Sequence, residues 1–172
     1  MAIFQSLVCA MVVALAPGLV AQDPVSSLPD AYSLQFENAW VKVVHVRYAA
    51  GASLPRHSHP AATLAFVYLT DAGPVDFNHT GGSSSTVTRP EVKAGAYRLA
   101  RGRDETHAVE NRSNTTSEFL RVEFKTDAAR VSPFRRRVAR KAYAAADTVA
   151  DVEFANAQVR ISRLRTNPSP CR

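Results

Sequence analysis

Short runs of apolar or alternating residues, separated by turn residues, recur along most of the chain. They predict strands at residues 34–48, 63–70, 75–80, 86–88, 96–99, 107–111 and 118–125. Turn signals such as Asp71-Ala72-Gly73-Pro74 and the stretch 81–85 separate these runs. No strong helical period competes with this pattern. The chain is therefore expected to form an all-β sandwich or barrel.

The last of these runs, residues 118–125, alternates apolar and charged residues from position 120 onwards. Side chains on a strand point to opposite faces in turn. We therefore expect Leu120, Val122 and Phe124 to face the core. Arg121 and its charged neighbours are expected on the solvent side.

Residues 1–21 differ in composition from the rest of the chain. They contain no Asp, Glu, Lys or Arg, residues 7–15 are almost entirely apolar, and Ala21 precedes the polar Gln22. This pattern predicts a secretory signal peptide, and hence a secreted or periplasmic protein. A retained anchor is the alternative, but Pro17-Gly18 interrupts the apolar run and leaves it short for a membrane span. We expect no stable membrane anchor.

Cysteines place a further limit on the mature chain. Only Cys9 and Cys171 are present, and Cys9 lies inside the predicted leader. Its removal would leave Cys171 alone, so we expect a domain that depends on its apolar core rather than on an internal disulfide.

A basic segment at residues 127–150 follows the predicted barrel, which spans residues 22–126. The formal net charge of the chain is +6, and residues 128–151 hold six basic and two acidic side chains. The segment is rich in Ala and Arg and lacks strand alternation, which predicts a short helix at 134–146 or a linker. A patch for an anionic partner is the alternative for residues 135–137. Few aromatic residues interleave with these arginines, so we expect a solvated linker face and no nucleic-acid partner.

The tail at residues 151–172 resembles the beginning of the barrel. Residues 154–165 align with residues 36–47 at an offset of 118, with Phe, Asn, Ala, Val and Arg identical. This spacing predicts a partial second repeat, here an extra strand that pairs with the barrel or with a partner subunit. Chance similarity between two amphipathic strands is the alternative.

The candidate chemistry lies in the histidines. His57 and His59 are separated by one residue, so on a strand they would point to the same face, and His107 follows in a strand-like run of its own. Neutral imidazoles that converge can hold one borderline ion. We predict that His57, His59 and His107 bind a divalent transition metal (Fe, Mn, Ni, Zn or Cu). Histidines that are packed or face solvent without a metal are the alternative.

Two motifs in this order resemble those of the cupin superfamily. Gly51, five further residues and His57-Ser58-His59 are similar to the first cupin motif, and His107 with Asn111 resembles the end of the second. The resemblance covers residues 36–125. It implies an all-β, cupin-type double-stranded β-helix, a jelly-roll barrel whose interior histidines ligate a metal. The basic segment and the tail would add a short helix or linker and a C-terminal extra strand.

The chain departs from the cupin pattern at one ligand position. Cupins usually place a glutamate a few residues after the paired histidines, whereas Thr63 occupies that place here and no carboxylate lies between His59 and Asp71. Its loss lowers the expected affinity for hard ions. Three imidazoles remain sufficient for a borderline ion with open positions for water or substrate.

The remaining candidate residues have less specific signals. Thr63, Tyr68 and Tyr97 are the candidate substrate-binding residues, with core packing as the alternative role for the tyrosines. His79 is expected at the surface, with a position facing the same cavity from a neighbouring strand as the alternative. Asn111 is expected to hold a loop by hydrogen bonding.

The resemblance implies an exported metal-binding protein that acts on a small-molecule ligand, as an oxygenase or else as an isomerase or lyase. A non-enzymatic barrel that binds a metal or small ligand is one alternative, and an assembly module is another. No side chain stands out as a general acid or base, so the sequence leaves open whether the protein is an enzyme. A homodimer is a candidate assembly.

Overall fold

The computed structural model describes residues 23–80, 84–126, 148–156 and 158–166. The predicted leader, both cysteines and the predicted helix at 134–146 lie outside these residues. Within the described ranges, no helix has the length and apolar character needed to cross a membrane.

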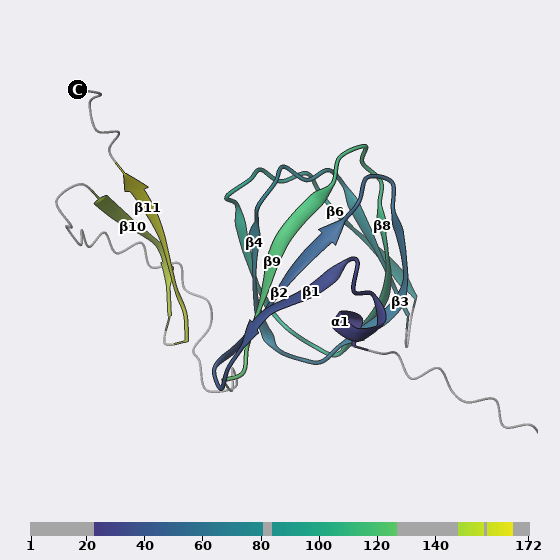
Figure 1. The fold of residues 1–172 in the computed structure, drawn as a ribbon, viewed down its shortest axis with the longest axis horizontal. Helices are drawn as coiled ribbons and strands as arrows, with labels where there is room; N and C mark the ends of the chain where they lie inside the picture. Colours follow the sequence, from purple (N-terminus) through teal and green to yellow (C-terminus); the bar gives the residue numbers. More distant parts are fainter. Residues whose placement is uncertain (1–22, 81–83, 127–147, 157, 167–172) are drawn as a thin grey trace, which may run out of the picture.

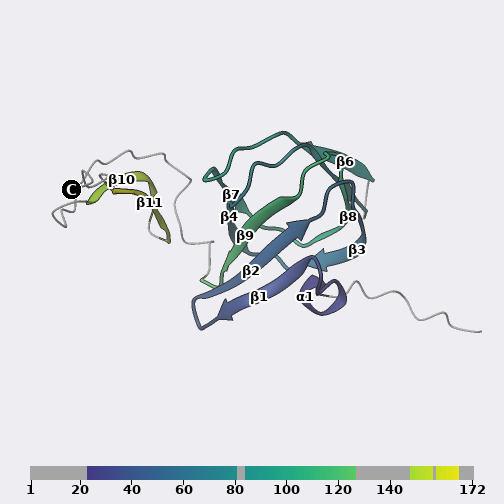
Figure 2. The same ribbon diagram turned by 45° about the horizontal axis from the view of Figure 1, so that its top comes forward.

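Strands make up most of the described chain. The elements are α1 (Pro24–Ser27), β1 (Tyr32–Glu37), β2 (Val41–Tyr48), β3 (Ser53–His59), β4 (Thr63–Tyr68), β5 (Val75–His79), β6 (Ser85–Arg89), β7 (Tyr97–Arg101), β8 (Glu105–Asn111), β9 (Ser117–Phe124), β10 (Thr148–Ala155) and β11 (Arg160–Thr166). The first nine strands form two antiparallel sheets with the orders β1-β2-β9-β4-β7 and β3-β8-β5-β6. Figures 1 and 2 show the two sheets wrapped around one interior. The predicted all-β double-stranded β-helix is confirmed.

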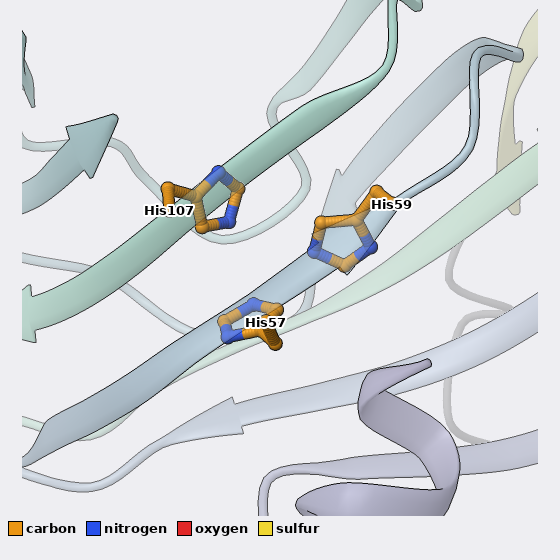
Figure 3. A group of neighbouring side chains, drawn as sticks. All are labelled: His57, His59 and His107. Carbon is orange, nitrogen blue, oxygen red and sulfur yellow. The ribbon is translucent and has the colours of Figure 1, made fainter. Parts of the chain in front are cut away.

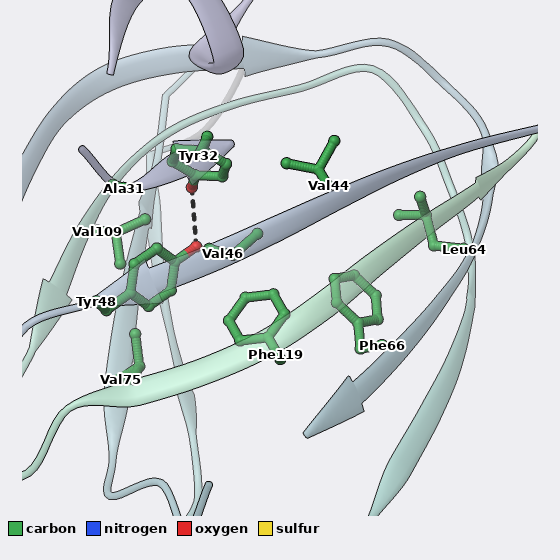
Figure 4. Close-up of a cluster of buried hydrophobic side chains, with 10 residues drawn as sticks. All are labelled: Ala31, Tyr32, Val44, Val46, Tyr48, Leu64, Phe66, Val75, Val109 and Phe119. Atoms are coloured by element: carbon green, nitrogen blue, oxygen red, sulfur yellow. Dashed lines mark hydrogen bonds between the residues drawn. The ribbon is translucent and has the colours of Figure 1, made fainter. Parts of the chain in front are cut away.

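The hydrophobic core lies between the two sheets. Figure 4 shows its buried side chains, which come from the segment after α1, from β1, β2, β4 and β9 of the first sheet and from β5 and β8 of the second: Ala31, Tyr32, Val44, Val46, Tyr48, Leu64, Phe66, Val75, Val109 and Phe119. The hydroxyls of Tyr32 and Tyr48 lie 2.8 Å apart and hydrogen-bond to each other inside this cluster. The two tyrosines therefore add apolar area to the core without leaving either hydroxyl unsatisfied.

The prediction for the faces of β9 was wrong. Phe119 and Arg121 are buried, with 6% and 5% of their surface exposed, and they face the interior. Leu120, Val122 and Phe124 occupy the opposite face. The reason is that the outer face of this sheet is also apolar: Val122 pairs there with the buried Ala65. Alternation of polarity therefore did not distinguish the two faces of β9. Because successive side chains alternate, an assignment that is wrong by one residue puts every side chain of the strand on the wrong face.

Asn111 has the loop-holding role that the sequence predicted. Its side-chain amide donates to the carbonyl oxygens of Tyr48, Ala49 and Thr115 at 3.0, 2.9 and 2.9 Å. Its Oδ1 accepts a hydrogen bond from the backbone N–H of Ser113 at 3.1 Å. This fully buried residue thereby ties the turn after β2 to the loop between β8 and β9.

The tail forms a hairpin of its own rather than a single strand. β10 and β11 pair with each other in a separate two-stranded sheet, and β10 begins inside the segment predicted as a linker. The hairpin lies beside the barrel (Figure 1). Hydrogen bonds join them: the Arg163 guanidinium donates to the carbonyl of Gly95 at 2.9 Å, and the Gln158 amide donates to the carbonyl and the hydroxyl of Thr126 at 3.1 and 2.7 Å.

The register of this hairpin reproduces that of β1 and β2. Leu34 pairs with Val44 before a register shift, as Val152 pairs with Ser162. The shift occurs at the same place in both hairpins, at an offset of 118 residues. The turns match as well, because Asn38 and Asn156 each accept two backbone N–H hydrogen bonds on Oδ1. The interpretation as a second repeat stays a prediction, with a matching backbone register as new support.

Candidate metal centre

The three predicted histidines meet on two neighbouring strands. β3 and β8 pair antiparallel with His57 opposite His107, and His59 lies two residues further along the same face of β3. All three side chains point into the barrel (Figure 3). Their exposed fractions are 1%, 4% and 3% for His57, His59 and His107. The alternation that the sequence predicted for the pair at 57 and 59 therefore holds, and the pairing of β3 with β8 adds the third ring.

The rings are close enough to share one ion. Their centroids lie 4.9 Å (His57 to His59), 4.8 Å (His57 to His107) and 5.1 Å (His59 to His107) apart. One nitrogen from each ring can be chosen so that all three lie within 4.8 Å of one another. Among the described residues, this is the group of histidines, cysteines and carboxylates whose arrangement suits a metal ion.

The protonation state of the rings also suits metal binding. Burial lowers the pKa of His57, lowers that of His107 to about 3, and places the pKa of His59 far below its ordinary value. The nearby Arg121 guanidinium acts in the same direction on all three. The histidines are therefore neutral at pH 7, which is the form that ligates a metal.

Hydrogen bonds distinguish the individual rings. Nδ1–H of His57 donates to the carbonyl of Pro55 at 2.9 Å, which leaves Nε2 facing the interior beside the Tyr32 hydroxyl. Both ring nitrogens of His107 are buried without a hydrogen-bond partner, and the nearest carboxylate, that of Glu105, is 3.8 Å from Nδ1. Such unsatisfied buried nitrogens are costly unless something binds them. The donor set and its unsatisfied nitrogens fit a borderline divalent ion.

Sequence reasoning missed Tyr32, which lies beside the trio. Its hydroxyl is 2.9 Å from Nε2 of His57 and its ring centroid is 5.8 Å from that of His59. Since His57 carries its proton on Nδ1, the Tyr32 hydroxyl donates to Nε2. Burial raises the pKa of Tyr32 well above its ordinary value, so the phenol keeps its proton at neutral pH. No signal in the sequence marks this residue, because only the pairing of β1 with β2 brings it to the histidines.

His59 and His107 line a cavity of about 40 Å³, which is room for a few water molecules. Aromatic residues line much of it, including the predicted Tyr68. Thr63 and Tyr97 lie outside its described lining. Strand alternation explains why Thr63 and Tyr97 lie outside the cavity: their neighbours Leu64 and Arg98 face inward. The predicted substrate role of Thr63 and Tyr97 therefore has no support from the cavity, and that of Tyr68 stays a prediction.

His79 faces this cavity and not the surface. It lies on β5 opposite His107, and the two ring centroids are 5.2 Å apart. The turn-like residues around it favoured an exposed position, but the pairing of β5 with β8 places it inside. His45, by contrast, is on the outer face of β2 and lies 3.2 Å from the Glu118 carboxylate.

Comparisons with known proteins gave matches among solved structures alone. No family model and no curated protein matches the sequence. Among solved structures, a cupin domain from Bordetella pertussis Tohama I is 26% identical with a TM-score of 0.46, and the match covers 55% of this chain and 92% of that one. An RmlC-like cupin protein from Desulfovibrio desulfuricans is 23% identical with a TM-score of 0.36, over 67% of this chain and 98% of that one. A double-stranded β-helix protein from Klebsiella pneumoniae is 19% identical with a TM-score of 0.39, over 57% and 78%.

The two sheets have the arrangement of a double-stranded β-helix. Thr63, which occupies the place expected for a glutamate ligand, alternates with the inward-facing Leu64, so its side chain points away from the histidines. The carboxylate closest to the trio comes instead from Glu105 on β8. It lines the cavity and also lies 3.9 Å from the Arg103 guanidinium.

Proposed function

We propose that this cupin-type barrel binds one divalent transition metal through His57, His59 and His107 and acts on a small molecule in the adjoining cavity. The observation that carries the proposal is the convergence of three buried, neutral imidazoles, one of which has both ring nitrogens without a partner. When bound, such an ion supplies Lewis-acid or redox chemistry toward a substrate, water or oxygen. The identity of the ion is left open among Fe, Mn, Ni, Zn and Cu.

The chain's own residues divide the remaining work. The Pro55 carbonyl fixes the ring of His57, and the aromatic wall restricts water. Nε2 of His57 has one lone pair, so it would exchange the hydrogen bond from the Tyr32 hydroxyl for the ion, and the phenol released beside the ion is the candidate proton donor. Its raised pKa makes it a poor base. The reaction class follows the same order as before, with an oxygenase first and an isomerase or lyase second.

Metal analysis tests this proposal. The purified full chain is incubated with Mn, Fe, Ni, Cu and Zn ions, desalted, and measured by inductively coupled plasma mass spectrometry. We expect one bound ion per chain, lost in His57→Ala and in His107→Ala. His45→Ala is the matched control and should keep the ion, since His45 lies on the outer face of the sheet. Equal metal content in His57→Ala and His45→Ala, or no ion in the parent chain, would overturn the proposal.

A non-enzymatic metal-binding barrel is the second candidate, favoured by the small volume of the cavity. Tyr32→Phe separates the two functions. In an enzyme that uses the phenol as a proton donor, this variant keeps the metal and loses turnover of a substrate found by screening. Equal turnover in Tyr32→Phe and in the parent chain would remove Tyr32 from the reaction, and absence of turnover with any screened compound favours the binding barrel.

Export of the protein is also part of the proposal. It rests on the composition of residues 1–21. N-terminal sequencing of the protein recovered from the periplasm or medium should give a mature chain that begins near Gln22. Recovery of Met1 in a membrane fraction would instead favour the retained anchor.

A further inference from the structure

Three arginines line the same cavity as His59 and His107. Arg89 on β6, Arg98 on β7 and Arg121 on β9 all line it. Arg121 is balanced by Glu123, whose carboxylate accepts from its Nε at 2.9 Å. Glu105 is the one acidic residue among the described lining residues. Positive charge therefore exceeds negative charge around this enclosed space.

Arg98 and Arg89 have no such counterion. The Nε atom of each is buried without a hydrogen-bond partner, and within the described part of the chain no carboxylate lies at ion-pair distance from either guanidinium. Burial and the neighbouring Arg89 lower the pKa of Arg98, and a hydrogen bond with the Tyr68 side chain and the charge of Glu105, which lies beyond ion-pair distance, offset part of this effect. Two cations close to each other and partly desolvated are costly unless an anion joins them.

Aromatic rings hold both guanidinium groups in place. Cζ of Arg98 lies 4.0 Å from the centroid of the Phe66 ring, within the range of a cation–π contact. Cζ of Arg89 lies 5.8 Å from the centroid of Phe77, and that ring lies 5.2 Å from the ring of His107. The arginines are therefore fixed on the wall beside the histidines, with Nε atoms still available to an acceptor.

We propose that the cavity binds a small carboxylate, whose oxygens pair with Arg98 and Arg89 while the rest of the molecule reaches the histidines. The planar guanidinium group matches a carboxylate in two parallel hydrogen bonds. The small volume favours a molecule of a few carbon atoms, such as a short dicarboxylate. This assignment rests on the proposed function, because it names the substrate class of the same site.

Calorimetric titration with malonate tests the proposal, with malonamide as the neutral probe of similar shape and inorganic phosphate as the other anion. The nickel-loaded full chain should bind malonate, bind it at least tenfold more weakly in Arg98→Gln, and not bind malonamide. The matched control is Arg103→Gln, since Arg103 is a mostly exposed arginine on a neighbouring loop. Malonate binding in this control should be unchanged, and metal content should be unchanged in both variants.

Three results would overturn the carboxylate assignment: equal binding of malonate and malonamide, equal affinity in Arg98→Gln and the parent chain, or phosphate binding that is tighter than malonate and equally dependent on Arg98. If Arg98→Gln does not fold by circular dichroism, Arg89→Gln replaces it with the same expected loss. Titration of the metal-free chain separates the two proposals. If the chain takes up no metal but binds malonate through Arg98, the metal proposal fails and the carboxylate assignment stands. If the chain takes up metal but does not bind malonate, the carboxylate assignment fails and the metal proposal stands.

Discussion

Lowering the pH from 7 to 4 should destabilise the metal-free barrel by about 3 kcal/mol through His107 alone. Burial lowers the pKa of His107 from 6.5 to about 3 in the folded state, whereas the unfolded chain has the ordinary value. Between these two values the unfolded state binds more protons, so stability falls as the pH falls. The contribution is fully present above pH 6.5 and is lost on the way down to pH 3. Each pKa unit corresponds to about 1.4 kcal/mol, which gives the figure above for a pH of 4.

Urea unfolding in the presence of EDTA at pH 7, 6, 5 and 4 measures this loss. Far-UV circular dichroism is the suitable signal, because the single tryptophan, Trp40, is 68% exposed and reports poorly on the core. In His107→Gln, which cannot titrate there, the fall in unfolding free energy between pH 7 and pH 4 should be smaller by about 3 kcal/mol. The same fall in both proteins would refute the buried, neutral state of His107 on which the metal site depends.

Three further predictions concern the barrel and its metal. Asn111→Asp should lower the unfolding free energy by about 3 kcal/mol in thermal unfolding, because a carboxylate cannot donate to the three carbonyls that the amide contacts. The control Asn78→Asp should cost far less, because Asn78 is half-buried and its side chain only accepts a hydrogen bond from Thr86. Equal losses in the two variants would contradict the loop-holding role of Asn111. Gly51→Ala should lower the unfolding free energy by about 1 kcal/mol, because φ is +65° at this position although the new Cβ meets no atom. Gly102→Ala should lower it more, because the new Cβ would overlap the backbone of Ala62. A larger loss in Gly51→Ala than in Gly102→Ala, measured by urea unfolding, would contradict the described backbone at these two glycines. Zinc at a hundred times its Kd should raise the unfolding free energy of the parent chain by about 2.7 kcal/mol, and it should not stabilise His107→Gln. Equal stabilisation of His107→Gln by zinc would mean that the ion binds away from the three histidines.

Much of the site could be predicted because strand alternation fixes local geometry. The spacing of His57 and His59 is enough to place both rings on one face, and Asn111 follows a strand at a position where a buried amide can reach several carbonyls. The fold class follows from the many short strands between turn residues. None of these inferences needs to know which strands pair.

The rest depends on strand pairing, which a single sequence does not reveal. Tyr32 reaches His57 only because β1 pairs with β2 in the sheet opposite the histidines. Arg121 and His79 were expected outside, since polar residues usually face solvent. In this barrel the interior holds a polar cavity, and the outer face of the first sheet carries apolar residues such as Ala65. At the candidate site, polar residues therefore face inward, which is the opposite of the usual rule used to predict the faces of a strand.

The most direct test of the account is zinc K-edge X-ray absorption on the zinc-loaded protein, because it counts imidazole ligands at the ion. The account predicts three imidazoles at about 2.0–2.1 Å in the parent chain and in His45→Ala, and loss of the bound zinc, with its imidazole signal, in His107→Ala. A spectrum without imidazole scattering, or one that His107→Ala leaves unchanged, would contradict the central claim that His57, His59 and His107 converge on one metal ion.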